Sequence, residues 1–161
     1  MEYFDINIEK ATLENKHYRN VIYTSPNKKT QLVLMSLRPH ESIGMEVHKN
    51  ADQFIRIEKG RCRAEIGIER KVIQMQDGSA IVIPAGTYHD IINYNEETKL
   101  YTIYSPAQHV DGLMQLDRPS DKLVEDTTKY PLPIKNTNEL TSDKVYDIFH
   151  NGGKLYKLKS D

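Results

Sequence analysis

The chain has 161 residues, with 22 lysines and arginines against 23 aspartates and glutamates. This length predicts one domain, or one domain with a long tail, and 38% hydrophobic residues place the chain among globular proteins. A chain of this size can bury a sizeable core without disulfide or metal staples. Because the charges balance, no positive field is available to bind a phosphate backbone, and we expect no nucleic-acid partner.

Cysteine usage and the N-terminal residues favour a cytoplasmic protein. Cys62 is the only cysteine, which excludes an intrachain disulfide framework and a cysteine-based zinc cluster. The first ten residues include acidic side chains and no apolar run, unlike a signal peptide. No stretch of the sequence approaches the roughly 20 apolar residues of a membrane helix. We therefore expect a cytoplasmic protein with no membrane partner.

The pattern of the sequence changes twice along the chain. Residues 1–17 form a polar N-terminal arm, in which the alternation from Tyr3 to Ile8 is compatible with one short strand. Residues 18–105 consist of short runs rich in Val, Ile and Tyr between clusters of Gly, Pro, Asn and Asp, which is typical of an all-β sandwich or barrel. Short connections favour antiparallel pairing, because parallel crossovers need a dozen residues or more. The expected strands are 18–23, 31–38, 44–48, 53–58, 61–68, 71–74, 79–83, 89–94 and 99–105.

Residues 106–161 form a C-terminal extension richer in Asp, Lys, Pro, Thr and Asn. Within it, Thr141 or Ser142 can cap a short amphipathic stretch, and Gly152 follows that stretch. The pattern predicts a short helix near residues 142–150.

Polar residues at strand spacing mark a candidate metal site. Side chains two apart on a strand share a face, so Glu46 and His48 can lean into the interior together and meet on one ion. On the next strand, Gln53 shares a face with isoleucines, where an unsatisfied buried amide costs about 1–3 kcal/mol. His89 follows the turn at Pro84 and Gly86. Each residue alone is more simply a surface or core side chain, but together their spacings favour convergence on one cation.

Tyr104 and His109 are weaker candidates for a catalytic role. Tyr104 shares a face with Leu100 and Thr102, so its hydroxyl either lines the interior or meets a backbone partner. His109 follows the last predicted strand and could reach the mouth of a barrel as an acid or base, although a surface position is the simpler interpretation.

At these residues the sequence resembles the cupin family. The second cupin motif is matched at every fixed position, which are Gly78, Pro84, Gly86, His89 and Asn93. The resemblance covers about residues 30–105 and the segment that follows, and is nearest to small single-domain cupins described as similar to mannose-6-phosphate isomerase.

The first cupin motif is matched with two altered positions. Counting back from Gly60 puts Gln53 at the family's glutamate position, and His48 and Glu46 at its two histidine positions. Asn50 gives an alternative frame, with His48 first and Asn50 second. We prefer Glu46 because it keeps the spacing and supplies an anionic ligand.

The resemblance implies an antiparallel double-stranded β-helix, or jelly-roll barrel, with a divalent metal near its centre and usually a homodimer. The ligand roles fall on Glu46, His48, Gln53 and His89. Two imidazoles, an amide and a carboxylate leave a divalent ion with a net charge of about +1, the same sum as three histidines and a glutamate. Nitrogen and oxygen donors without thiolate suit Zn, Mn, Fe, Co or Ni and do not choose among them.

Three functions are compatible with such a site. The resemblance favours an isomerase or epimerase that acts on a small sugar or polyol. The alternatives are an iron-dependent oxidoreductase and a non-catalytic carbohydrate- or metabolite-binding protein. A phosphorylated substrate is disfavoured because we find no lysine or arginine that clearly faces the interior: Arg56, Arg61 and Arg63 fall on predicted outer faces. The catalytic base is not identified, and Glu46, if it is not a ligand, and His109 are the candidates.

Overall fold

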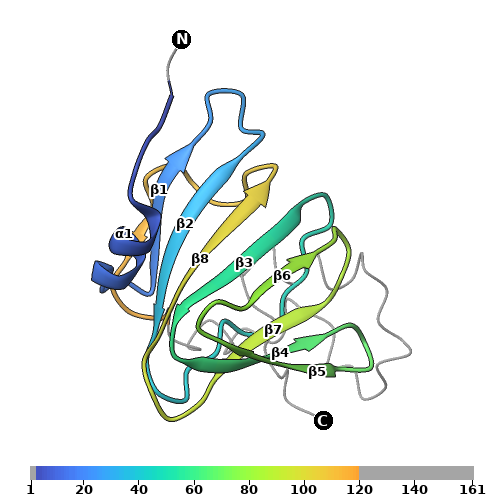
Figure 1. Cartoon of the computed structure of the whole chain (residues 1–161). Helices are drawn as coiled ribbons and strands as arrows, with labels where there is room; N and C mark the ends of the chain where they lie inside the picture. The colour runs from blue at the N-terminus through green and yellow to red at the C-terminus, as the bar shows by residue number, and fades with distance from the viewer. Residues whose placement is uncertain (1–2, 120–161) are drawn as a thin grey trace.

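Two antiparallel sheets enclose the core, as the sequence predicts (Figure 1). The computed structural model describes residues 3–119. Its elements are α1 (Ile8–Glu14), β1 (Arg19–Thr24), β2 (Gln31–Leu37), β3 (Asp52–Lys59), β4 (Arg61–Ile66), β5 (Lys71–Gln76), β6 (Ala80–Ile83), β7 (His89–Asn93), β8 (Thr98–Ser105) and β9 (Met114–Gln115). The larger sheet has the strand order β6-β3-β8-β2-β1-β9, and the smaller sheet has the order β5-β4-β7.

The inner wall of the larger sheet is apolar along most of its length and polar at one end. Strand β8 pairs with β3 so that Tyr104 lies opposite Gln53 and Thr102 opposite Ile55. On its other side, Tyr104 lies opposite Gln31 of β2. All five side chains are buried. Because cross-strand partners share a face, Gln31, Tyr104 and Gln53 form a polar row at one end of an otherwise apolar wall.

The N-terminal arm contains a helix, and the short strand considered for Tyr3 to Ile8 is wrong. Asn7 caps the helix: its side-chain oxygen accepts a hydrogen bond from the backbone N–H of Lys10 at 3.0 Å. Such a cap satisfies a donor of the first turn and favours helix over strand. The helix α1 contacts β2, β3 and β8 of the larger sheet. Among residues 3–119, no helix is both long and apolar enough to cross a membrane.

The segment 44–48 is not a regular strand, contrary to expectation. Gly44 has a φ of +85°, which breaks the extended pattern at its start. Two isolated bridges instead join this region to β7, one between Ser42 and Ile92 and the other between Glu46 and His89. The Glu46–His89 bridge has both backbone hydrogen bonds, at 2.8 and 2.9 Å. The backbone therefore places Glu46 directly opposite His89.

The chain returns to the larger sheet after residue 105. Strand β9 pairs with β1 in the register Arg19 with Gln115 and Asn20 with Met114. The predicted helix near residues 142–150 lies outside the described residues.

A glycine pair offers a test of the packing at one end of the barrel. Gly60 has a φ of +93°, and a Cβ added there would lie 2.5 Å from Thr98 Oγ1 and 2.6 Å from the backbone oxygen of Glu97. Gly67 has a φ of +76°, but a Cβ there would meet nothing within 4 Å. We expect Gly60→Ala to lower the free energy of unfolding by about 3 kcal/mol or more, because overpacking adds to backbone strain. Gly67→Ala introduces the backbone strain without the overpacking, and we expect it to lower the free energy of unfolding by about 1 kcal/mol. Urea unfolding followed by circular dichroism measures both; equal losses would contradict the close packing at Gly60.

Candidate metal centre

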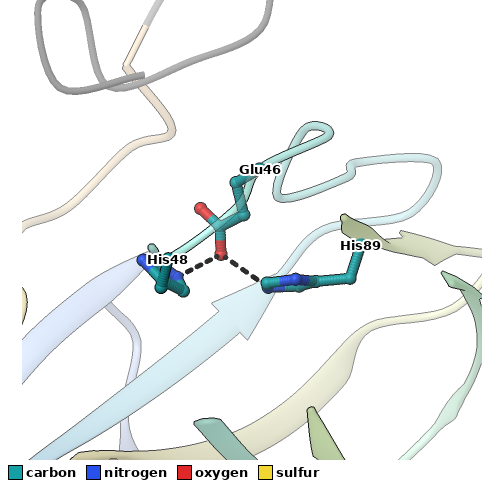
Figure 2. A group of neighbouring side chains, drawn as sticks. All are labelled: Glu46, His48 and His89. Atoms are coloured by element: carbon teal, nitrogen blue, oxygen red, sulfur yellow. Dashed lines mark hydrogen bonds and ion pairs between the residues drawn. The ribbon is translucent and has the colours of Figure 1, made fainter. Parts of the chain in front are cut away.

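Three buried side chains, Glu46, His48 and His89, form a compact cluster inside the fold (Figure 2). Glu46 Oε1 lies 3.3 Å from Nε2 of His48 and 3.3 Å from Nε2 of His89. The potential ligand atoms of the three residues all lie within 4.8 Å of one another. One carboxylate oxygen is therefore shared by two imidazoles that come from different parts of the chain.

The backbone fixes the positions of these three side chains. Glu46 and His48 are two residues apart, and their side chains lie together, with His48 Nε2 3.3 Å from Glu46 Oε1. The backbone oxygen of His48 accepts a hydrogen bond from Gly86 N at 2.8 Å, which ties this segment to the turn before β7. His89 begins β7 and is bridged to Glu46. Two segments about 40 residues apart in sequence thus meet at one point.

The hydrogen bond of His89 determines which of its ring nitrogens faces the cluster as an acceptor. Nδ1 lies 2.9 Å from the backbone oxygen of Thr87, which can only accept, so Nδ1 carries the proton. In the neutral ring, Nε2 then has a lone pair. That atom is buried and has no hydrogen-bond partner, although Glu46 Oε1 is 3.3 Å away. A lone pair facing a carboxylate oxygen is unfavourable, and a cation between the two removes the conflict.

The electrostatics keep Glu46 ionised. Burial raises the pKa of Glu46, but His48 and His89 outweigh burial, so the pKa lies well below its usual range. A buried carboxylate that is charged needs a positive partner. The cluster supplies the donor types of a divalent metal site, one anionic oxygen and two imidazole nitrogens.

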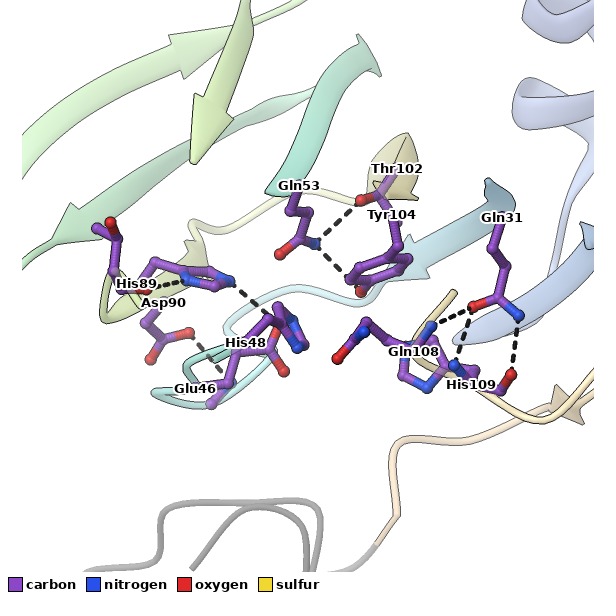
Figure 3. Close-up of polar contacts among 12 residues, drawn as sticks. Gln31, Glu46, His48, Gln53, His89, Asp90, Thr102, Tyr104, Gln108 and His109 are labelled. Carbon is purple, nitrogen blue, oxygen red and sulfur yellow. Dashed lines mark hydrogen bonds and ion pairs between the residues drawn. The ribbon is translucent and has the colours of Figure 1, made fainter. Parts of the chain in front are cut away.

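Gln53 is held so that its amide oxygen remains available. Its Nε2 donates to Thr102 Oγ1 at 3.0 Å and to the Tyr104 hydroxyl at 3.1 Å. Its Oε1 is buried and has no hydrogen-bond partner. In Figure 3 the amide oxygen of Gln53 points toward the rings of His48 and His89, and its nitrogen points toward Thr102 and Tyr104. The His48 ring meets the Tyr104 ring edge-on at 5.1 Å, so the cluster directly adjoins the partner of Gln53.

The alternative frame places Asn50 among the ligands, but Asn50 is exposed in the structure. Glu46, by contrast, is buried in the cluster. The geometry therefore favours the frame that contains Glu46.

Tyr104 and His109 continue the row of rings away from the metal cluster. The His109 ring meets the Tyr104 ring edge-on at 5.0 Å. Burial raises the pKa of Tyr104 above its usual range, and the charge of Glu46 adds to this effect. Burial, with a smaller contribution from the charge of Arg19, lowers the pKa of His109 to about 3. Near neutral pH, Tyr104 is therefore protonated and the imidazole of His109 is uncharged.

Gln31 holds the segment that carries His109, a role that sequence reasoning missed. Gln31 Oε1 accepts hydrogen bonds from the backbone N–H groups of Gln108 at 3.1 Å and of His109 at 2.9 Å. Its Nε2 donates to the backbone oxygen of His109 at 2.8 Å (Figure 3). A fully buried glutamine on a core strand was the available signal, because such an amide must find partners.

Arg19 is a second residue that sequence reasoning missed. The three arginines placed on outer faces, Arg56, Arg61 and Arg63, form ion pairs with glutamates. Arg19 instead lies two residues before Val21, a core residue of β1, and so shares its inward face. The expectation that no cation faces the interior is therefore wrong at Arg19, and the alternation of β1 was the signal that could have found it.

Comparisons with known proteins agree with this fold. Residues 33–104 match the cupin domain family Cupin_2. The uncharacterized protein L612 of Acanthamoeba polyphaga mimivirus is 50% identical over 117 residues, which cover 71% of this chain and 72% of L612. The uncharacterized protein YrkC of Bacillus subtilis is 41% identical over 128 residues, which cover 76% of this chain and 68% of YrkC.

A solved structure extends the agreement to three dimensions. The crystal structure of BH2720 from Bacillus halodurans superposes with a TM-score of 0.67 at 37% sequence identity, covering 71% of this chain and 89% of that one. The sequence relatives, the domain match and the two-sheet architecture all lead to one conclusion: the chain belongs to the cupin superfamily.

Proposed function

We propose that Glu46, His48 and His89 bind one divalent metal ion, and that the chain uses this ion in a reaction on a small metabolite. The observation that carries the proposal is the buried carboxylate oxygen 3.3 Å from both imidazoles. The unpartnered amide oxygen of Gln53 is a further ligand in this proposal. The donor set contains no sulfur, so Zn, Mn, Fe, Co and Ni are the candidate metals.

The reaction for which the interior offers most is proton transfer beside a carbonyl group, as in an isomerase or epimerase. When bound, the metal would act as a Lewis acid on the carbonyl oxygen of the substrate. His109 is the proton acceptor in this proposal, because its buried Nε2 has no hydrogen-bond partner and its ring adjoins Tyr104. Tyr104 keeps its proton and can donate a hydrogen bond to a substrate oxygen.

The finer expectations that come from the family resemblance stay predictions. They are the likeness to mannose-6-phosphate isomerase, a sugar or polyol substrate, and a homodimer. A sugar or polyol substrate fits the proposed site, because such a metabolite carries oxygens that can bind a metal ion.

An iron-dependent oxidoreductase is the second candidate function. Two histidines and one carboxylate form the ligand set of non-haem iron oxygenases, which leave positions open for dioxygen and substrate. Glu46, His48 and His89 are such a set. This candidate uses the same ligands and differs in the metal and in its need for dioxygen.

The ligand assignment predicts which variants lose metal. We expect His48→Ala and His89→Ala each to abolish stoichiometric metal binding, because each removes an imidazole from the cluster. Asn50→Ala changes an exposed residue and should keep the metal, which makes it the matched control. Mass spectrometry of metals on protein purified without chelator and reloaded with zinc measures all three. Full metal content in both histidine variants would refute the assignment.

The role of Gln53 is tested by Gln53→Met, which keeps the approximate volume but removes the amide oxygen. We expect metal affinity to fall by about 10- to 100-fold, in the range found when groups that support a metal site are removed. Competition with a chromophoric chelator gives the affinity, and circular dichroism gives the fold. An unchanged affinity in a folded variant would show that Gln53 supports the wall of the site without serving as a ligand.

The proposed reaction is tested by deuterium exchange. Protein loaded with each candidate metal is incubated in D₂O with a panel of small aldoses, ketoses and their phosphates, and NMR detects deuterium at the carbon beside the carbonyl. We expect metal-dependent exchange that falls by about 10²- to 10⁴-fold in His109→Phe, which removes the base but keeps a ring against Tyr104. Iron-dependent oxygen uptake without exchange would support the oxidoreductase instead. Metal-loaded protein that binds these compounds without either reaction would indicate a binding protein.

A further inference from the structure

The inner face of β1 carries a positive charge that the proposed metal chemistry does not use. Asn20, the next residue, directs its side chain toward Asn15 at the end of α1, on the outer side of the sheet. Arg19 therefore points away from α1, since neighbouring residues of a strand face opposite sides. Its cross-strand partner is Gln115 of β9. A charged side chain on the inward face of a cupin sheet requires an explanation.

The guanidinium of Arg19 is only partly satisfied by the protein. Nη1 donates to Gln115 Oε1 at 2.7 Å, and Cζ lies 5.3 Å from the centroid of the Tyr18 ring. Nε is buried and has no hydrogen-bond partner. Within residues 3–119, Arg19 forms no ion pair with a carboxylate. An unmet buried donor costs about 1–3 kcal/mol, so the fold holds Arg19 ready for an acceptor that the described chain does not supply.

The charge of Arg19 acts on two residues next to the metal cluster, Tyr104 and His109. At His109 this charge contributes to the low pKa of the imidazole. The rings of His48, Tyr104 and His109 follow one another at centroid distances of 5.1 and 5.0 Å. His109 is thus joined through one ring, that of Tyr104, to a residue of the metal cluster.

We infer that Arg19 binds an oxyanion of the substrate, a carboxylate or a phosphate group, while the other end of the substrate reaches the metal centre. The inference rests on the proposed function, because the metal centre defines where the reacting end lies. With Nη1 held by Gln115, the edge formed by Nε and Nη2 remains for the ligand, and this edge matches two oxygens of a carboxylate or phosphate. The substrate class is therefore a small anionic hydroxy-carbonyl compound.

This arrangement also gives His109 a position along the bound substrate. The His109 ring contacts the Tyr104 ring, which contacts the His48 ring, so in this inference His109 lies beside a substrate that reaches the metal centre. The carbon that exchanges its proton then lies between the two anchored ends. Gln31 keeps the backbone of His109 in place for this role.

Anion binding by purified protein tests the inference without an assay of activity. Inorganic phosphate and malonate are titrated by calorimetry into zinc-loaded wild type, Arg19→Gln and Arg61→Gln. Arg61 is an exposed arginine paired with Glu96, and its variant is the matched control. We expect at least one of the two probes to bind the wild type and Arg61→Gln with equal affinity. Its affinity for Arg19→Gln should be lower by a factor of about ten or more. The probe that binds better identifies the oxyanion as phosphate or carboxylate.

Two results would overturn the inference: neither probe binds the wild type, or Arg19→Gln binds as tightly as the wild type. If Arg19→Gln does not fold, ¹⁵N NMR of the wild type replaces it. The Nε resonance of Arg19 should shift on addition of the probe, and an unmoved resonance overturns the inference.

The same titration separates this inference from the proposed function. Metal content is measured on every sample, and the titration is repeated on metal-free protein. Arg19-dependent binding in protein that cannot be loaded with metal supports the anion site and contradicts the metal role. Stoichiometric metal without Arg19-dependent binding overturns the anion site alone.

Discussion

One interaction organises the interior of this protein: two buried imidazoles lie 3.3 Å from a single oxygen of a buried carboxylate. Removing a carboxylate from water is costly unless positive charge compensates it. In a neutral His89 ring the one proton lies on the nitrogen that faces Thr87, so the nitrogen that faces Glu46 carries a lone pair. A divalent cation satisfies Glu46 and both imidazoles together, and the fold brings the three groups together by backbone pairing.

The polar wall around the cluster follows from the strand register. Gln31, Tyr104 and Gln53 lie side by side across three strands, and each has a separate task. Gln53 directs its amide oxygen into the site. The Tyr104 ring contacts the rings of His48 and His109. Gln31 holds the backbone of the segment that carries His109. The two hydrogen bonds that keep Gln53 in place use its amide nitrogen, so its amide oxygen stays available to a ligand.

Much of the fold and of the cluster can be predicted from the sequence, because both depend on local patterns. Alternation of apolar and polar residues predicted the strands. Spacing, with the cupin resemblance, predicted four ligands, Glu46, His48, Gln53 and His89, of which Glu46, His48 and His89 form the cluster. The segment at Glu46 was predicted as a strand, yet it pairs with β7 through isolated bridges, since Gly44 interrupts the regular backbone. The helix α1 was missed because its signal is one capping residue, Asn7, in a short polar arm. Arg19 and Gln31 were missed because their roles depend on partners 96 and 78 residues away.

X-ray absorption spectroscopy of the zinc- or cobalt-loaded protein tests the central claim most directly, because it reports the donor atoms around the bound ion. The account predicts a single site whose spectrum shows two imidazole ligands at about 2.0–2.1 Å, oxygen ligands in the remainder of the shell and no sulfur. A shell made of oxygen alone, without imidazole scattering, would show that the metal binds elsewhere and would contradict the account.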